Sequence, residues 1–406
     1  MAGLAALALG YVLSQLYRSF LAVLTPALTV ELGATKADLS LASGAWFIAF
    51  ALMQFVVGVS LDRYGPRRTA ATLLALGGGG GTFLFSVATA PWMITAAMAL
   101  IGIGCSPVLM ASVFIFARKY RPARLAILTS WMIAFGSAGN VIGASPLATA
   151  AEAFGWRPVM AGLGAITVLI AVGVLLFVRD PEHVEDGSGK AGFSGYFELL
   201  KVRYLWPLLP LATLNYAPAA GIRGLWAGPY LSDIYGADAL AIGQVTLFMA
   251  LAMVVGSFVY GPLDTIFGTR KWVAVVGNAI GVAAIAYLAL DTVPGIPAAT
   301  ILFVVIGITG SSYGLLMAHG KAFVPAHLTG RGVTLLNFFP IGGVGVMQFI
   351  TGGVVTAAAD PADPVASYTA LYLFYAVTLA GAVLIYLWSR DAKPEAVAKE
   401  TARAAP

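Results

Sequence analysis

The chain has 406 residues, of which 60% are hydrophobic and 10% are charged, and its mean hydropathy is +0.89. Soluble proteins are nearer a quarter charged, so this composition excludes a soluble globular domain and indicates a polytopic membrane protein. The net charge of +5 does not indicate nucleic-acid binding, because the basic residues lie between apolar segments. One cysteine, Cys105, and three scattered histidines predict no disulfide, no metal site and no cofactor.

Apolar segments long enough to cross a bilayer recur along the whole chain. Such a segment needs about 20 apolar residues and must satisfy its own backbone hydrogen bonds, so it is a helix. The sequence predicts an all-α membrane protein with twelve transmembrane helices, over 4–29, 39–60, 69–88, 92–117, 124–148, 157–178, 205–231, 240–262, 272–290, 296–318, 332–357 and 366–388. The predicted domains are a six-helix bundle at 1–178, a cytoplasmic linker with an interfacial helix at 179–204, a second six-helix bundle at 205–390 and a cytoplasmic tail at 391–406.

The first span carries a polar stripe, with Tyr11, Gln15, Arg18 and Thr25 on one helical face. Of the 23 Lys and Arg residues, only Arg18 and Arg223 lie well inside apolar segments. A cation at bilayer depth is costly and is usually kept for function, so we expect Arg18 to face a cavity and bind an anion. The alternative is that Arg18 snorkels to the interface.

The loop after the second span reads Gly58-Val-Ser-Leu-Asp62-Arg63-Tyr-Gly65-Pro-Arg67-Arg68. Gly65 permits a tight turn, and Asp62 can meet Arg118 at the end of the fourth span or the positive end of a neighbouring helix. A contact that forms in one conformation and breaks in another would act as a latch. The alternative is that the arginines of the loop only hold this loop on the cytoplasmic side of the membrane.

Nearly all Lys and Arg residues lie in the loops after even-numbered spans, in the linker and in the tail. The opposite loops hold Lys36 and Arg157. This asymmetry places both termini in the cytoplasm, as expected for a protein of a bacterial inner membrane.

The two halves repeat at a spacing of 203 residues, with matches at helix ends and loops such as Pro26 with Pro229 and Gly65 with Gly268. Span 7, which opens the second half, carries Tyr216, Arg223 and Trp226 on one face beside Pro218, Gly221 and Gly224. The exact repeat partner of Arg18 is Gly221, two residues or about 200° of helix away from Arg223. Either a bend at the Pro and Gly residues corrects this, or Arg223 pairs with Asp233 or Asp238.

The loop motif resembles the signature of the major facilitator superfamily between its second and third helices, and Asp264, Gly268 and Arg270-Lys271 resemble its degenerate copy. The resemblance covers essentially the whole chain. It implies the major facilitator fold, two pseudo-symmetric six-helix bundles that work by alternating access. It also implies a conformational latch that favours the outward-open state, formed by Asp62, Gly65, Arg67, Arg118, Asp264 and Arg270.

The first helix also resembles that of the organophosphate/phosphate exchangers of this superfamily, through Tyr17-Arg18, Pro26, Gly33 and Asp38-Leu39. Those exchangers bind phosphate between arginines of the first and seventh helices, which implies an anion-binding role for Arg18. Polarity and depth add Asn140, Tyr313 and Asn337 as cavity-lining candidates, together with Trp46 and Gln54. The alternative for each is hydrogen bonding between helices.

These features predict a transporter of a small organic anion, a carboxylate or an organophosphate, that is a monomer in the bilayer and not an enzyme. All 18 Asp and Glu residues lie at helix ends, in loops, in the linker or in the tail, whereas a proton symporter normally needs a buried titratable group. Two uncompensated cations favour obligatory anion exchange. The alternatives are proton-coupled symport of a carboxylate and efflux of drugs or neutral compounds.

Overall fold

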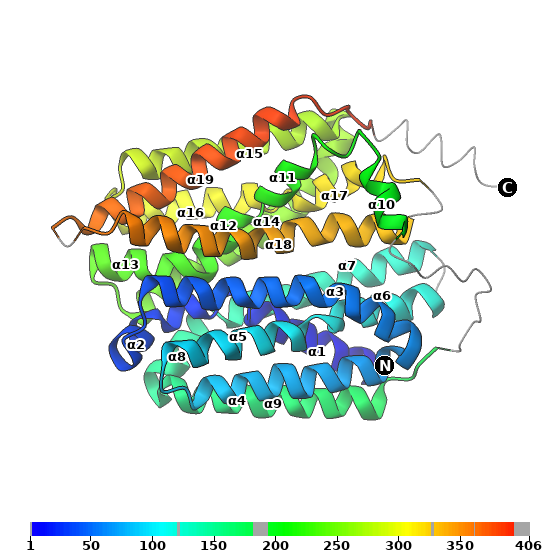
Figure 1. Ribbon diagram of the computed structural model, residues 1–406, viewed down its shortest axis with the longest axis horizontal. Coiled ribbons are helices and arrows are strands. Elements are labelled where there is room, and N and C mark those ends of the chain that lie inside the picture. The colour runs from blue at the N-terminus through cyan, green and yellow to red at the C-terminus, as the bar shows by residue number, and fades with distance from the viewer. Residues whose placement is uncertain (1, 120–121, 182–193, 326–328, 361, 394–406) are drawn as a thin grey trace. The chain divides into compact units, whose positions relative to one another are not determined.

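The computed structural model describes residues 2–119, 122–181, 194–325, 329–360 and 362–393, and it does not describe some side chains within helices, that of Asp62 among them. The described chain is helical, apart from loops and one isolated β-bridge between Asp360 and Asp363. Eight of its helices are long and apolar enough to cross a membrane, and the bent pair Ala2–Leu16 and Leu21–Leu32 makes a ninth (Figure 1).

The chain divides into two compact units that each gather segments from different parts of the sequence. Unit 1 comprises Met1–Glu185, Arg223–Ala250 and Gly345–Thr356. Unit 2 comprises Asp186–Ile222, Leu251–Val344 and Ala357–Pro406. Part of the predicted second bundle, Arg223–Ala250, therefore packs with the first six predicted spans.

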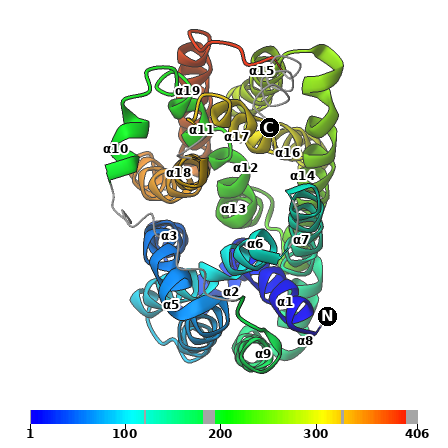
Figure 2. The ribbon, with the colours of Figure 1, turned by 90° about the vertical axis from the view of Figure 1, so that its right-hand side faces the viewer.

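Unit 1 is built on close helix pairs, notably α3 with α5, α1 with α7 and α1 with α9, whose end-on arrangement can be followed in Figure 2. Its helices are α1 (Ala2–Leu16), α2 (Leu21–Leu32), α3 (Lys36–Leu73), the π-helix η1 (Leu74–Gly79), α4 (Gly80–Ser86), α5 (Pro91–Cys105), α6 (Pro107–Lys119), α7 (Pro122–Ile142), α8 (Ser145–Phe154), α9 (Trp156–Phe177) and α13 (Ala227–Tyr235). The glycine run in η1 and α4 serves packing, because a methyl group on Gly77 would lie 2.7 Å from the Gly104 nitrogen of α5.

In unit 2, α15 packs against α16 and α19. Its helices are α10 (Ser194–Leu200), α11 (Leu209–Leu214), α12 (Ala217–Gly221), α15 (Arg270–Leu290), α16 (Ile296–Gly310), α17 (Tyr313–Lys321) and α19 (Pro364–Tyr386). Three further elements have residues in both units, namely the π-helix η2 (Ile222–Trp226), α14 (Ala239–Phe267) and α18 (Thr329–Ala357).

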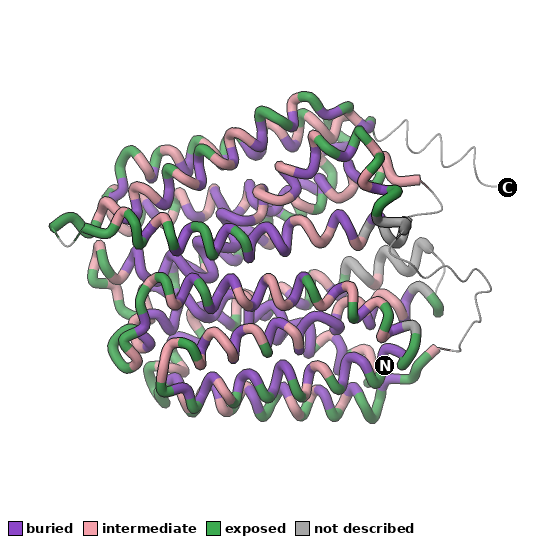
Figure 3. The backbone as a smooth tube through the Cα atoms, in the orientation of Figure 1, coloured by how far each residue is buried: buried purple, intermediate pink, exposed green. Residues whose placement is uncertain are grey.

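Many of the membrane helices are buried on one face and exposed on another, as the alternating colours of Figure 3 show, whereas the seventh span is buried all round from Ala217 to Leu231. The exposed faces are apolar and include Val59, Leu76 and Leu169, as expected of surface that meets lipid tails. Several predicted spans are interrupted at their centres. Span 1 breaks between α1 and α2, span 4 between α5 and α6, span 7 at Asn215 and in η2, and span 10 between α16 and α17.

Candidate functional site

Arg18 lies in the break of the first span and not within a continuous helix. The break covers Tyr17–Phe20 and bends the span by 53°. Within it the Arg18 amide donates to the Gln15 carbonyl at 3.3 Å and the Ser19 amide to Leu16 at 3.0 Å, each three residues back instead of four. Irregular backbone at membrane depth is tolerated where it is buried in protein or lines a cavity. The break therefore marks the depth at which a ligand can meet both backbone and Arg18.

The guanidinium of Arg18 lies over two aromatic rings of α3. Its central carbon is 5.2 Å from the ring centroid of Trp46 and 4.8 Å from that of Phe50, and these two rings stack on each other. Among the described residues no salt bridge joins Arg18 to a carboxylate. The Nε of Arg18 and the Nε1 of Trp46 are both buried without a hydrogen-bond partner in the described part of the chain.

The same face of α3 continues to Gln54, one turn beyond Phe50. Its amide nitrogen donates to the Ser106 carbonyl at 3.2 Å, in the break between α5 and α6. Trp46, Phe50 and Gln54, spaced i, i+4 and i+8, thus connect the break that holds Arg18 to the break of the fourth span. The sequence indicated Trp46 and Gln54 as candidates but missed Phe50, although the aromatic pair at i, i+4 was a usable signal.

The polar stripe of the first span packs against α7. Gln15 donates to the Tyr11 hydroxyl at 3.2 Å, and both side chains are buried. The ring of Tyr11 packs against Gly136 of α7, where a methyl group would clash with it. Asn140 lies one turn beyond Gly136 on the same face of α7, and its Oδ1 is buried without a partner among the described residues.

The second arginine, Arg223, lies in the π-helix η2 and is only 2% exposed. A π-helix adds one residue to a helical turn and so shifts the register of the residues after it, which is less than the two-residue offset between Arg223 and the repeat partner of Arg18. The next residue, Gly224, packs on the broken first span, where a methyl group on it would lie 2.7 Å from the Arg18 carbonyl oxygen. The backbones beside the two arginines are therefore adjacent within unit 1.

The two carboxylates expected as alternative partners of Arg223 each have a contact of their own. Asp233 forms an ion pair with Lys36 at 2.7 Å, and Asp238 accepts the amide of Ala241 at 2.8 Å. Trp226, another predicted binding residue, is fully buried and donates its indole N–H to Thr351 at 3.1 Å. This hydrogen bond connects the start of α13 to α18.

The remaining candidates lie in unit 2. The rings of Tyr216 and Tyr313 have centroids 5.5 Å apart, at the break before α12 and at the start of α17. Tyr313 also lines a narrow apolar recess with Leu336, the neighbour of Asn337. The sequence did not predict a buried polar cluster close by, in which Asn215 donates to Asn278 at 2.6 Å and to Ser312 at 2.8 Å. This cluster joins the breaks of spans 7 and 10.

The first predicted latch loop is held by a residue outside the motif. Gly65 has a φ of 81°, and a methyl group there would lie 2.8 Å from the Asp180 carboxyl group. Asp180 accepts the Arg67 amide at 2.8 Å, and the Arg67 Nε donates to Leu175 at 2.6 Å. The side chain of Asp62 lies outside the described residues, so its predicted contact with the exposed Arg118 stays a prediction.

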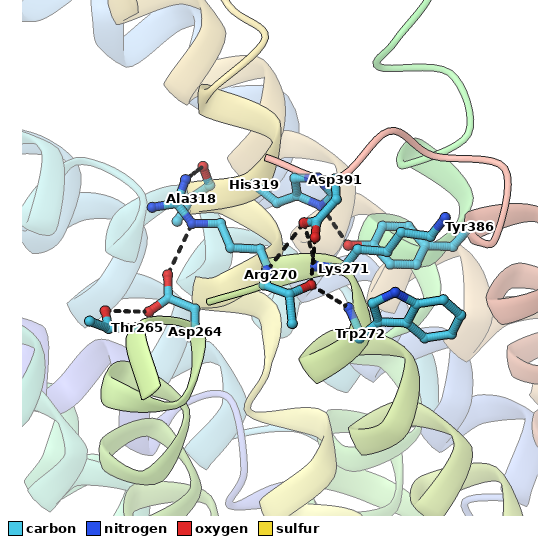
Figure 4. Close-up of polar contacts among 10 residues, drawn as sticks. Asp264, Thr265, Arg270, Lys271, Trp272, Ala318, His319, Tyr386 and Asp391 are labelled. Carbon is cyan, nitrogen blue, oxygen red and sulfur yellow. Dashed lines mark hydrogen bonds and ion pairs between the residues drawn. The ribbon is translucent and has the colours of Figure 1, made fainter. Parts of the chain in front are cut away.

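The second predicted latch loop has a similar arrangement with more contacts (Figure 4). The Arg270 Nε donates to Asp264 at 3.0 Å, and both side chains are mostly buried. Asp391 accepts the Thr269 hydroxyl at 2.5 Å and the Lys271 amide at 3.1 Å. Burial alone would raise the pKa of Asp391, but these hydrogen bonds stabilise its anion and hold the pKa below its ordinary value. Asp180 and Asp391 thus play matching parts after the last span of each predicted bundle.

Helices broken at membrane depth beside the partly buried Arg18 and the buried Arg223 are the arrangement in which membrane transporters bind their substrates. The sequence model of the Major Facilitator Superfamily matches residues 7–225, and the chain belongs to this superfamily. The predicted all-α membrane fold is thereby confirmed. The superfamily comprises transporters and not enzymes, as expected from the sequence.

Two curated relatives match part of the chain. A probable L-galactonate transporter of Escherichia coli (strain K12) is 25% identical over 61% of this chain and 58% of its own length. The probable sulfoacetate transporter SauU of Cupriavidus necator is 22% identical over 62% of this chain and 61% of its own length. The chain thus spans about three fifths of the curated relatives it matches.

A solved structure shares the fold over nearly the whole chain. It is that of a bacterial homolog to the human lysosomal transporter Spinster, in an inward-facing and occupied conformation. The two proteins are 20% identical, the match covers 95% of this chain and 96% of the other, and the TM-score is 0.73.

The close approach at Gly224 is directly testable. Replacing Gly224 by Ala forces a methyl group against the Arg18 carbonyl, and we expect a destabilisation of about 1–3 kcal/mol, as for an overpacked core, measured by thermal unfolding of the purified protein. Gly261 of α14 is the matched control, because a methyl group there meets nothing within 4 Å. Equal melting temperatures for Gly224→Ala and Gly261→Ala would contradict the packing described here.

Proposed function

We propose that the chain is a secondary active transporter that moves a small organic anion, a carboxylate or an organophosphate, by alternating access. The observation that carries this proposal is the Arg18 site, a partly buried cation on an aromatic pair with buried N–H donors that have no partner among the described residues. Buried donors without partners cost about 1–3 kcal/mol each, and an anion that accepts from them removes that cost. The two curated relatives are described as transporters of organic anions, a sugar acid and a sulfonated acid, which supports the same class.

Anion exchange is the proposed mode of coupling. Among the described residues the only carboxylate counted as buried is Asp264, and it is paired with Arg270 near a helix end. Arg18 therefore has no buried carboxylate partner to neutralise it when the site is empty. Reorienting an empty site would carry an uncompensated cation through a dry barrier, whereas a bound anion neutralises it. The protein would work as a monomer in a bacterial inner membrane with both termini in the cytoplasm, as the Lys and Arg asymmetry supports.

A latch at the cytoplasmic loops completes the proposed cycle. The contacts that support it are those of Arg67 with Asp180 and of Arg270 with Asp264 and Asp391. The contacts with Asp180 and Asp391 join the start of a third helix to the segment after a sixth helix, and the contact with Asp264 joins it to the end of a second helix. Charged hydrogen bonds of this kind can hold one conformation and release the other without touching the substrate site.

Replacement of Arg18 tests the anion site. We expect Arg18→Ala to weaken binding of L-galactonate or sulfoacetate, whichever the wild type binds more tightly, by about 100-fold, because charged hydrogen bonds are lost. Arg18→Lys should remain poor, since an ammonium cannot grip a carboxylate through two parallel bonds. Binding is measured by isothermal titration calorimetry. Arg63→Ala, which removes an exposed arginine stacked on Tyr64, is the control in the same experiment. Wild-type affinity in Arg18→Ala would refute the site.

Exchange and proton symport are separated by uptake into proteoliposomes. We expect uptake of the radiolabelled anion to be at least about tenfold faster into vesicles loaded with the same unlabelled anion than into empty ones, because the loaded site reorients more easily. An imposed pH gradient should add little. Rapid pH-driven accumulation into empty vesicles would overturn exchange and leave the anion site standing.

A further inference from the structure

A cavity lies at the ends of three helices of unit 1, and Arg18 is not among its lining residues. Its volume is about 440 Å³, within the range of small-molecule sites. The start of α1 and the ends of α6 and α9 form its walls, with Leu4, Leu7, Ile115 and Phe177 among the lining residues. Leu7 and Ile115 belong to the hydrophobic core of the unit, so the inner wall of the cavity is apolar.

Two cations line this apolar cavity, Lys119 at the end of α6 and Arg179 just after α9. No carboxylate lines it among the described residues. The acidic neighbour of Arg179, Asp180, accepts the Arg67 amide, and the Arg67 Nε donates to the Leu175 carbonyl. The nearby carboxylate is thus engaged elsewhere, and the cavity presents positive charge beside apolar walls.

The cavity also borders surface that meets lipid. Leu176 and Phe177, which line it, are 66% and 57% exposed, as expected of side chains at the lipid-facing end of a membrane helix. The ends of α6 and α9 correspond to even-numbered spans, after which the chain concentrates its Lys and Arg residues. Basic pockets between helices on the cytoplasmic side are typical binding sites for anionic lipid headgroups.

We infer that this cavity binds an anionic phospholipid of the cytoplasmic leaflet. Lys119 and Arg179 hold the phosphodiester of the headgroup, and the walls formed by Leu4, Leu7 and Phe177 receive the first part of an acyl chain. The lipid therefore bridges the ends of α1, α6 and α9. This inference does not depend on the identity of the transported anion.

Native mass spectrometry of the purified full chain tests the inference, with dioleoyl phosphatidylglycerol and dioleoyl phosphatidylcholine as probes. We expect phosphatidylglycerol to bind more tightly, and the double variant K119Q/R179Q to lose about 30-fold in affinity for it, about one factor of five for each cation. The control R63Q/R68Q removes two exposed cations of the same half that do not line the cavity, and it should lose less than about twofold.

A second variant keeps the test decisive if K119Q/R179Q does not fold. Ala2→Trp places a large side chain in the cavity without changing its charge, and it should also weaken phosphatidylglycerol binding. Equal binding of the two lipids, or equal losses in the two charge variants, would overturn the inference. Full competition by glycerol 3-phosphate, which has no acyl chains, would also overturn it in favour of a site for free phosphate.

Discussion

The structure depends on how one guanidinium at membrane depth is stabilised. Stacking of Arg18 on Trp46 and Phe50 contributes about 2 kcal/mol when the cation is desolvated, which is less than the several kcal/mol that a buried ion loses on leaving water. The missing part can come from an anion that accepts from the buried donors. Arg18 lies in the break of the first span and against the aromatic face of α3. Gln54 on the same face of α3 contacts the break of the fourth span.

The two halves of the repeat use interrupted helices at corresponding places but complete them differently. In the first half the breaks meet at a cation, whereas in the second half those of spans 7 and 10 are joined by the neutral cluster of Asn215, Asn278 and Ser312. The π-helix at Arg223 and the bare backbone of Gly224 let the seventh span lie against the first. The two halves of an internal repeat can therefore place different polar groups at corresponding helix breaks.

The sequence was sufficient to predict the fold class, because span length, charge asymmetry and the loop motif can each be recognised without knowing how the helices pack. It also predicted Arg18 as a candidate site residue, since a cation inside an apolar run is visible without a structure. It did not reveal Phe50, because an aromatic residue in a membrane helix usually contacts lipid. Nor did it reveal Asp180 and Asp391 as partners of the latch loops, since those contacts join residues more than 100 positions apart. The sequence also did not reveal helix breaks in those spans whose hydropathy stays uniform across the break.

The central claim, that the bound anion lies against Arg18, is tested most directly by a distance measurement in the bilayer. Solid-state NMR dipolar recoupling between ¹⁵N-labelled arginine guanidinium groups and the ¹³C-labelled carboxylate of a bound organic acid reports contacts within about 4 Å, the range of a charged hydrogen bond. We expect strong dephasing in the wild type and its loss in Arg18→Lys at ligand saturation. Dephasing that persists unchanged in Arg18→Lys would place the anion on another arginine and contradict the account.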